Sequence, residues 1–257
     1  FENPPSYHRP ILVSNRMKWK YVGVLHEYLV NIDPIKSDEY LLGNFHIHSR
    51  RLGDRSKNPN KYLDDAIVLE MGYHDEVSDI GLKNRYSYYC AQSYHDAGKF
   101  EKAIEWYENT LNLDFSPQYI YCACIKAGDC YNVLKKSSDA IDSWSKAYTY
   151  DKERLEGIAK LMEYYYYKGA HFMVSSLYNK FKHLKIGDAK DKIFLDYSKY
   201  HDIHYFASIS GCYCDEHKSA YEACKYLLLN NRPNPGNTIF NLQFYMKHFK
   251  EDAENKS

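Results

Sequence analysis

The side chains of this sequence whose types and spacing could do chemistry lie near its N-terminus. His26 and Glu27 end the pattern R-x-x-W-x-Y-x-G-x-x-H-E, which begins at Arg16. His46 and His48 follow about twenty residues later, in a segment with strand character. Side chains two positions apart on a strand share a face, so these two imidazoles could share a metal ion, although no third ligand is apparent. The alternatives are structural: a polar pair that satisfies loop backbone, and an ordinary histidine at position 48.

The elements that must position these side chains are short. Residues 1–58 differ from the rest of the chain in their prolines and in their runs of alternating or apolar residues. Such runs predict strands over 11–13, 19–25 and 45–48. Three short strands are too few for a stable sheet. We therefore expect another domain, or an N-terminal region absent from this sequence, to complete it.

From residue 59 onward the apolar residues recur with a helical period. Pro59 predicts the start of a helix that runs to about Met71. Beyond it, tyrosines and small residues recur at spacings of 37 and then 34 residues: Tyr94, Tyr131 and Tyr165, with Ala103, Ala140 and Val174. A period near 34, with small residues at a helix crossing and an aromatic four residues later, resembles the tetratricopeptide repeat.

The repeat is expected to degrade after about residue 190. Helices are predicted over 193–200, 204–212, 216–229 and 238–249, but their spacing no longer fits the period. Terminal repeats that cap a stack are atypical, which would account for the loss. The tyrosine run at 164–167 is interpreted as part of a helix that is packed on both sides.

The N-terminal motifs, taken in order with the helical region, resemble a known family. After W-x-Y-x-G-x-x-H-E and a strand that ends in histidine comes G-D-R-S-K-x-P-x-K-Y-L-x-D-A, which begins at Gly53. This order resembles the C-terminal end of family 2 glycosyltransferases in which a GT-A-type catalytic domain precedes tetratricopeptide-like helices. The resemblance covers nearly the whole chain. It implies that residues 1–58 end a GT-A-like catalytic domain and that residues 59–257 form a helical repeat domain, so the fold class is mainly α.

The resemblance also implies a metal-dependent, inverting transferase that uses a nucleotide-sugar donor. Such enzymes hold the donor diphosphate on a divalent cation, Mn²⁺ or Mg²⁺, and His48 stands where many of them place a late histidine ligand. His26 and Glu27 match the H-E element near the acceptor. Guanidinium and ammonium groups are suited to neutralising the diphosphate, for which the candidates are Arg50, Arg51, Arg55 and Lys57. The Asp-x-Asp motif and the base of the family would lie upstream of this sequence. The alternative for the basic residues is a solvated loop.

A non-catalytic scaffold is the second hypothesis. The inner helices of a tetratricopeptide-like stack line a groove that holds an extended peptide. The residues expected on these inner faces are Arg85, Tyr88, Gln92, His95, Asp129 and Asn132. Residues 1–58 discriminate between the hypotheses, because a plain scaffold does not need W-x-Y-x-G-x-x-H-E, whereas a transferase does.

The composition narrows the classes of partner. Lys and Arg total 34, as do Asp and Glu, so the formal charge is zero and no nucleic-acid surface is expected. No apolar run approaches the roughly 18 residues of a membrane span. Seven cysteines, placed mostly in apolar helical patterns, indicate reduced thiols and a cytoplasmic protein. The expected partners are a nucleotide-sugar with a protein or glycan acceptor, and a protein partner or second copy at the repeats.

Overall fold

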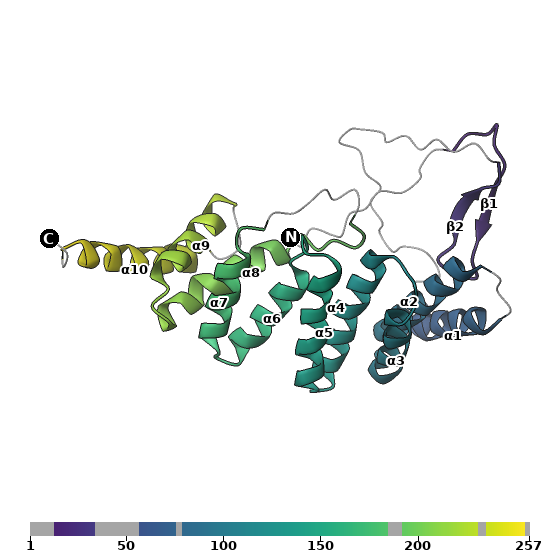
Figure 1. The fold of residues 1–257 in the computed structure, drawn as a ribbon, viewed down its shortest axis with the longest axis horizontal. Coiled ribbons are helices and arrows are strands. Elements are labelled where there is room, and N and C mark those ends of the chain that lie inside the picture. The colour runs from purple at the N-terminus through teal and green to yellow at the C-terminus, as the bar shows by residue number, and fades with distance from the viewer. Residues whose placement is uncertain (1–12, 34–56, 76–78, 185–191, 231–234, 255–257) are drawn as a thin grey trace. The chain divides into compact units, whose positions relative to one another are not determined.

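The computed structural model describes residues 13–33, 57–75, 79–184, 192–230 and 235–254. These residues form ten α-helices and one two-stranded sheet, so the prediction of a mainly α, helical-repeat fold is confirmed (Figure 1). The helices fall into two compact units. The N-terminal unit holds the described residues up to Ser116 together with 129–136, and the C-terminal unit holds 117–128 and the described residues from 137 onward.

A β-hairpin opens the N-terminal unit. Strand β1 (Trp19–Val22) pairs antiparallel with β2 (Tyr28–Asn31). The predicted strand over 19–25 ends early because Gly23, with a φ of 121°, begins the turn, and His26 in the same turn has a φ of 51°. Positive φ values break strand geometry. The strand at 28–31 was not predicted, and the one predicted at 45–48 lies outside the described residues.

Three helices and the end of a fourth complete this unit. They are α1 (Lys61–His74), α2 (Ile80–Asp96), α3 (Phe100–Leu111) and the last residues of α4 (Pro117–Val133). Helix α1 matches the helix predicted from Pro59 to Met71, shifted by two to three residues. The Asp79 side chain caps α2 by accepting a hydrogen bond from the backbone N–H of Leu82 at 3.1 Å. The unit's core is mostly apolar and aromatic: Leu69, Tyr86, Cys90, Tyr94 and Tyr107.

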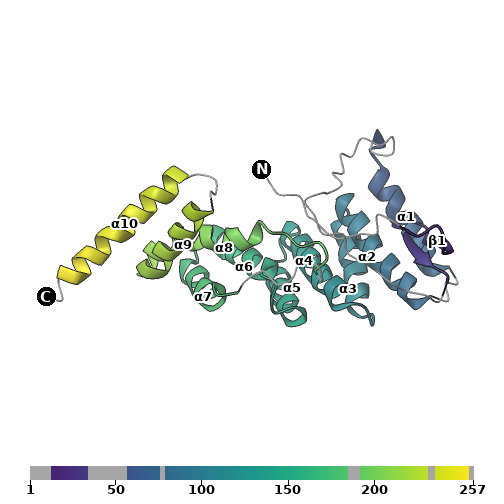
Figure 2. The ribbon, with the colours of Figure 1, turned by 90° about the horizontal axis from the view of Figure 1, so that it is seen from above.

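The C-terminal unit contains the start of α4 and six further α-helices. These are α5 (Ser137–Tyr150), α6 (Glu156–Tyr167), α7 (His171–Phe181), α8 (Lys199–Ser210), α9 (His217–Leu229) and α10 (Pro235–Glu254). A 3₁₀ turn, η3 (Gly211–Tyr213), extends α8. Figure 2 shows α10 as one long helix that follows α9.

Helices α2 to α9 form four consecutive pairs: α2–α3, α4–α5, α6–α7 and α8–α9. Each pair repeats the same two packing positions in its second helix. The fourth residue is small and at most 1% exposed, and the eighth is at most 2% exposed and in three pairs aromatic: Ala103 and Tyr107, Ala140 and Trp144, Val174 and Tyr178, Ala220 and Cys224. The close crossing that this allows is visible at Gly128 of α4, where an added Cβ would come within 2.5 Å of the Trp144 ring. The same positions continue in α8 and α9, which form a fourth pair, although the spacing along the sequence changes before it.

In each pair, the three residues before the second helix share a common backbone; in the fourth pair they follow the 3₁₀ turn η3. The residue two before the second helix has a φ between 58° and 71°: Gly98, Lys135, Gly169 and Asp215. The next N–H donates to a carbonyl five residues earlier, as in a Schellman cap: Lys99 to Tyr94, Lys136 to Tyr131, Ala170 to Tyr165 and Glu216 to Gly211. Glycine is the usual residue at such a position, so Lys135 and Asp215 hold a backbone that costs an ordinary side chain roughly 1–2 kcal/mol.

A long connection before the fourth pair breaks the sequence period, so the period alone does not reveal this pair. Five residues separate the other consecutive pairs, but seventeen, 182–198, separate α7 from α8. The helix predicted over 193–200 is wrong, since α8 begins at Lys199. The carbonyl oxygen of Ile193 instead accepts a hydrogen bond at 2.9 Å from Arg154, a buried side chain also paired with Glu156 at 2.7 Å. A helix would have used that carbonyl internally.

Candidate functional site

The turn of the hairpin lies on α1 and α2. The backbone N–H of Val24 donates a hydrogen bond to the Tyr86 hydroxyl at 2.9 Å, and Nη2 of Arg85 donates to the carbonyl oxygen of His26 at 3.1 Å. Gly72 of α1 leaves room for this approach, since an added Cβ would come within 2.9 Å of the Val24 side chain. The turn is therefore fixed by two hydrogen bonds and a close contact.

His26 packs flat on the face of Tyr89. The ring centroids are 4.0 Å apart and the planes differ by 7°. Partial burial lowers the pKa of His26 from its ordinary value, the charge of Asp65 opposes this shift, and Arg85 assists it. His26 and the neighbouring Glu27 are both exposed residues. A neutral imidazole beside a carboxylate can accept a proton or a hydrogen bond from a bound molecule.

Most residues predicted for donor binding lie outside the described residues: His48, Arg50, Arg51 and Arg55. Lys57 is exposed, four residues before the first residue of α1. Within the part of the chain that the structure describes, no three His, Cys, Asp or Glu side chains come together as a metal site. None of the described helices is long and apolar enough to cross a membrane.

The residues predicted for a peptide groove have different surroundings. Tyr88 is 2% exposed and packs edge-on against Tyr89 and Tyr107, so it has no surface to offer a peptide. Arg85 lies under the hairpin and donates a hydrogen bond to the backbone of His26, a residue predicted for the transferase site. The remaining four are half-buried or exposed on α2 and at the end of α4: Gln92, His95, Asp129 and Asn132. The chain's own hairpin thus occupies part of the predicted groove.

Three buried cysteines, Cys122, Cys124 and Cys224, are not activated nucleophiles. All seven cysteines are free, and five are buried. Burial raises the pKa of Cys122 to about 11 and that of Cys124 and Cys224 to about 12. A thiol becomes nucleophilic as the thiolate, so these side chains act as small core residues.

A connected group of six aromatic residues lies in the C-terminal unit, and we call it the aromatic surface. Its members are Tyr166, Tyr167, His171, Tyr205, Phe206 and Tyr213. The closest contact is a stack of His171 on Tyr213, with centroids 4.1 Å apart. Tyr167 and Tyr213 are 75% and 67% exposed. Partial burial, with the neighbouring tyrosines, raises the pKa of Tyr166.

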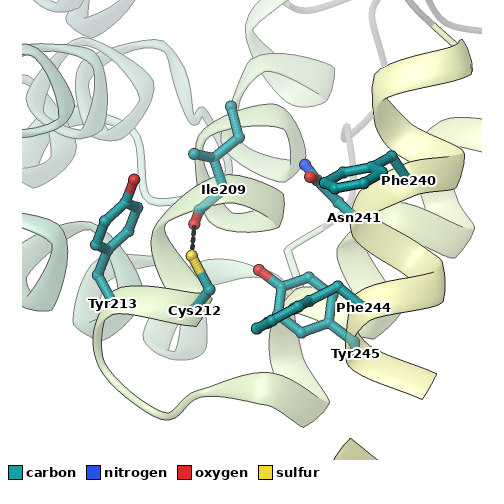
Figure 3. A pocket seen from close by; sticks show the side chains of 7 residues that line it. All are labelled: Ile209, Cys212, Tyr213, Phe240, Asn241, Phe244 and Tyr245. Atoms are coloured by element: carbon teal, nitrogen blue, oxygen red, sulfur yellow. Dashed lines mark hydrogen bonds between the residues drawn. The ribbon is translucent and has the colours of Figure 1, made fainter. Parts of the chain in front are cut away.

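A pocket of about 260 Å³ opens between α8–η3 and α10, next to the aromatic surface. Figure 3 shows the side chains of Phe240, Asn241, Phe244 and Tyr245 on α10, with Ile209 of α8 and Cys212 of η3 beside them. The lining residues are Ile209, Cys212, Tyr213, Phe240, Asn241, Phe244 and Tyr245. Tyr213 belongs to both features, so the pocket and the aromatic surface are continuous.

Sequence reasoning missed both features. The run 164–167 was interpreted as packed on both sides, yet none of these tyrosines is buried and Tyr167 is largely exposed. In α10 the signal was present, because Phe240 and Phe244 lie four residues apart and so share one face of the helix. Exposed aromatic side chains that gather on one face can mark a binding surface.

Comparisons with known proteins add little. No protein-family model matches the chain, and no curated protein matches it. Among solved structures, the chain is similar to one from Bacteroides ovatus ATCC 8483 for which protein binding is proposed. The two share 16% sequence identity and a TM-score of 0.38, over 75% of this chain and 89% of the other.

Proposed function

We propose that the protein is a non-catalytic helical-repeat scaffold that binds a partner polypeptide at the aromatic surface of its C-terminal unit. The observation that carries this proposal is the exposure of three tyrosines in one ring network, Tyr167, Tyr205 and Tyr213, at 75%, 41% and 67%. Exposed apolar patches of this kind mark interaction sites, and tyrosine is enriched among the residues that dominate binding energy.

The chemistry of the surface favours a polypeptide over a nucleic acid. A single-stranded nucleic acid stacks on aromatic rings but also needs a cationic groove for its backbone. The chain's 34 Lys and Arg residues are balanced by 34 Asp and Glu residues, so no excess of positive charge is available for such a groove. Tyrosine rings offer apolar contact and a hydrogen-bonding hydroxyl, which suits a peptide with apolar side chains.

A displayed random-peptide library tests the proposal. Enriched peptides would be synthesised and their dissociation constants measured by calorimetry against the full chain and against Tyr167→Ala/Tyr213→Ala. We expect at least about a tenfold loss of affinity, equivalent to about 1.4 kcal/mol. The matched control is Tyr21→Ala, since Tyr21 is 74% exposed but lies on β1 of the other unit. The proposal is contradicted if no peptide is enriched. It is also contradicted if Tyr167→Ala/Tyr213→Ala binds the enriched peptides as tightly as Tyr21→Ala.

A transferase half-site is a second proposal, favoured by one observation. His26 and Glu27 present exposed faces at the hairpin turn, where Arg85 and Lys61 are close enough to lower the pKa of His26. These cations would support an anionic donor. Titration of the chain with UDP-glucose and MnCl₂ should then release heat that His26→Ala abolishes. No heat from the unmodified chain would reject this proposal for the chain as it stands.

A further inference from the structure

Lysine and arginine side chains lie over tyrosine rings in both units of the described structure. The guanidinium carbon of Arg85 is 4.8 Å from the ring centre of Tyr28 and 5.1 Å from that of Tyr89. The guanidinium carbon of Arg154 is 4.2 Å from the ring centre of Tyr121. A cation in this position is attracted by the electron-rich face of the ring. Lysine ammonium groups lie at 4.3 to 5.6 Å from six further rings: Tyr62, Tyr73, Tyr94, Tyr164, Tyr178 and Tyr221.

The tyrosines of the aromatic surface lack such a cation. Among the described residues, no lysine or arginine lies over the ring of Tyr166, Tyr167, Tyr205 or Tyr213. Three of these side chains, Tyr167, Tyr205 and Tyr213, are 75%, 41% and 67% exposed. The surface therefore offers exposed tyrosine rings without the cation that accompanies other tyrosines of the chain.

Carboxylates outnumber lysines close to these rings. Two of them, Asp215 and Glu216, follow Tyr213 by two and three positions, and both are exposed. The Asp215 side chain is 97% exposed. A cation that reaches the Tyr213 ring therefore finds two exposed carboxylates close by along the chain. Within four positions of the six ring residues, or about one helical turn, the sequence has four carboxylates and one lysine: Glu163, Asp202, Asp215 and Glu216, with Lys168.

Two lysines near the surface already have partners. Lys168 lies over the ring of Tyr164, which is not a member of the aromatic surface, at 5.6 Å. Lys199 is paired with Asp202 at 2.8 Å and stands six positions before Tyr205. Neither ammonium group is placed over a ring of the surface, so the cation for these rings would come from another molecule. Lys160 and Lys218 stand farther along the chain, six and five positions from the nearest ring residue.

Arginine is the cation that suits a ring beside a carboxylate. Its planar guanidinium can stack on an aromatic face and also donate paired hydrogen bonds to a carboxylate, whereas the lysine ammonium is a compact, strongly hydrated charge. The chain contains an example of this combination. Arg154 lies over the Tyr121 ring and donates a hydrogen bond to the Glu156 carboxylate at 2.7 Å.

We propose that the aromatic surface binds an arginine-bearing segment of a partner polypeptide. Its guanidinium groups lie over the exposed tyrosine rings and beside the carboxylates that follow Tyr213, and its apolar side chains fill the space between the rings. The charges are complementary, because the partner supplies cations where the surface has ring faces and carboxylates. This inference rests on the proposed scaffold function and names the chemistry of the partner.

The probe is a fluorescein-labelled peptide of four Ser-Leu-Arg repeats. Two matched peptides carry lysine or citrulline in place of arginine, and citrulline keeps the shape of the arginine side chain without its charge. We expect saturable binding of the arginine peptide to the full chain by fluorescence anisotropy. The lysine peptide should bind about threefold more weakly and the citrulline peptide at least about tenfold more weakly.

Variants of the protein locate the binding. Tyr167→Leu/Tyr213→Leu keeps apolar side chains but removes two rings, so affinity for the arginine peptide should fall at least about fivefold. Asp215→Asn/Glu216→Gln removes two charges and should weaken binding about threefold. Asparagine tolerates the φ of 58° at position 215. Tyr21→Leu, at an exposed ring of β1, is the matched control and should bind normally. Near-ultraviolet circular dichroism verifies that each variant is folded.

Five outcomes overturn the proposal. The first three are no saturable binding of the arginine peptide, equal binding of the citrulline peptide, and equal binding by Tyr167→Leu/Tyr213→Leu and Tyr21→Leu. In the fourth, free arginine amide competes as well as the peptide at equal guanidinium concentration, so that a small cation is the ligand. In the fifth, sedimentation velocity shows a dimer that Tyr167→Leu/Tyr213→Leu dissociates, so that a second copy is the occupant.

The peptide library separates this proposal from the scaffold function on which it rests. If library peptides without arginine bind the aromatic surface while the arginine peptide fails, only the present proposal is lost. If the library yields no peptide and the arginine peptide also fails, the scaffold function is lost with it.

Discussion

The two units treat an aromatic helix face differently. In the N-terminal unit the hairpin covers α2, so that Tyr86 is 3% exposed and Tyr89 is 9% exposed. In the C-terminal unit Phe240 of α10 lines an open pocket and remains 71% exposed. Both helices carry large rings. They differ in how far other parts of the same unit bury those rings.

The rings of α2 make contacts with the hairpin that the exposed ring of Phe240 on α10 does not make. The hairpin contributes an apolar side chain, a backbone donor for the Tyr86 hydroxyl and a ring for Tyr89. These contacts stabilise the folded chain, whereas the exposed ring of Phe240 contributes little to its stability. Truncating a ring in the N-terminal unit should therefore cost stability, and truncating Phe240 should cost much less.

The largest expected effect is a direct contrast of two ring deletions. Tyr89→Ala removes a nearly buried ring and should lower the free energy of unfolding by about 3 kcal/mol. Phe240→Ala removes an exposed ring and should change it by less than about 0.5 kcal/mol. Urea denaturation followed by circular dichroism measures both. Equal losses would show that the Phe240 ring is packed in solution and would break the comparison.

Two glycines sharpen the contrast between the faces. In Gly72→Leu the new side chain would collide with Val24 and the Tyr86 ring, so the hairpin turn should lift and stability should fall by about 2 kcal/mol. Gly236→Leu in α10 meets no atom within 4 Å of its Cβ and should be nearly neutral. Hydrogen exchange should report lost protection of the amides of 19–31 in the first variant. Unchanged exchange there would mean that Gly72 does not govern docking.

Lowering the pH should reduce the free energy of unfolding more through His204, which is buried, than through His26, which is partly buried. Burial lowers the pKa of His204 to about 3, and its ring stacks on Tyr226 at 3.6 Å. Because this folded pKa is below the unfolded value near 6.5, stability is complete above pH 6.5 and falls as pH falls toward 3. We expect a loss of about 1–2 kcal/mol between pH 7 and 5. His204→Phe should flatten this slope, as seen by urea denaturation at several pH values, and His26→Phe should flatten it less. The same slope in His204→Phe and the wild type would refute the assignment.

The smallest effect concerns one hydroxyl. Tyr86→Phe deletes the acceptor for the Val24 N–H and should cost about 1 kcal/mol. Tyr213→Phe, at an exposed ring, should cost less than about 0.5 kcal/mol. Thermal unfolding by calorimetry resolves the difference. If the two variants unfold alike, the turn is held by the stack of His26 and the close contact at Gly72 rather than by this bond.

The fold was predictable where local spacing determines it. Ala103, Ala140 and Val174 lie at equal positions because a close helix crossing requires a small side chain there, and that requirement is visible in the sequence. The helices of the fourth pair were predicted but not its place in the repeat, since seventeen residues precede it. The sites were harder still, because the contact of His26 with Tyr89 joins residues 63 positions apart through a turn that begins where a strand was expected.

The constant three-residue connection within each pair fixes the rotational phase of the second helix. One residue inserted beside Gly98 would turn the following helix by about 100°, which would carry Ala103 and Tyr107 out of the crossing. The seventeen residues before α8 show that length can change between pairs while the phase within them is kept. The helix pair is therefore the repeating unit of the fold. Whole pairs could be added, deleted or exchanged in such a chain, whereas one residue inserted inside a pair would disrupt the packing of its two helices.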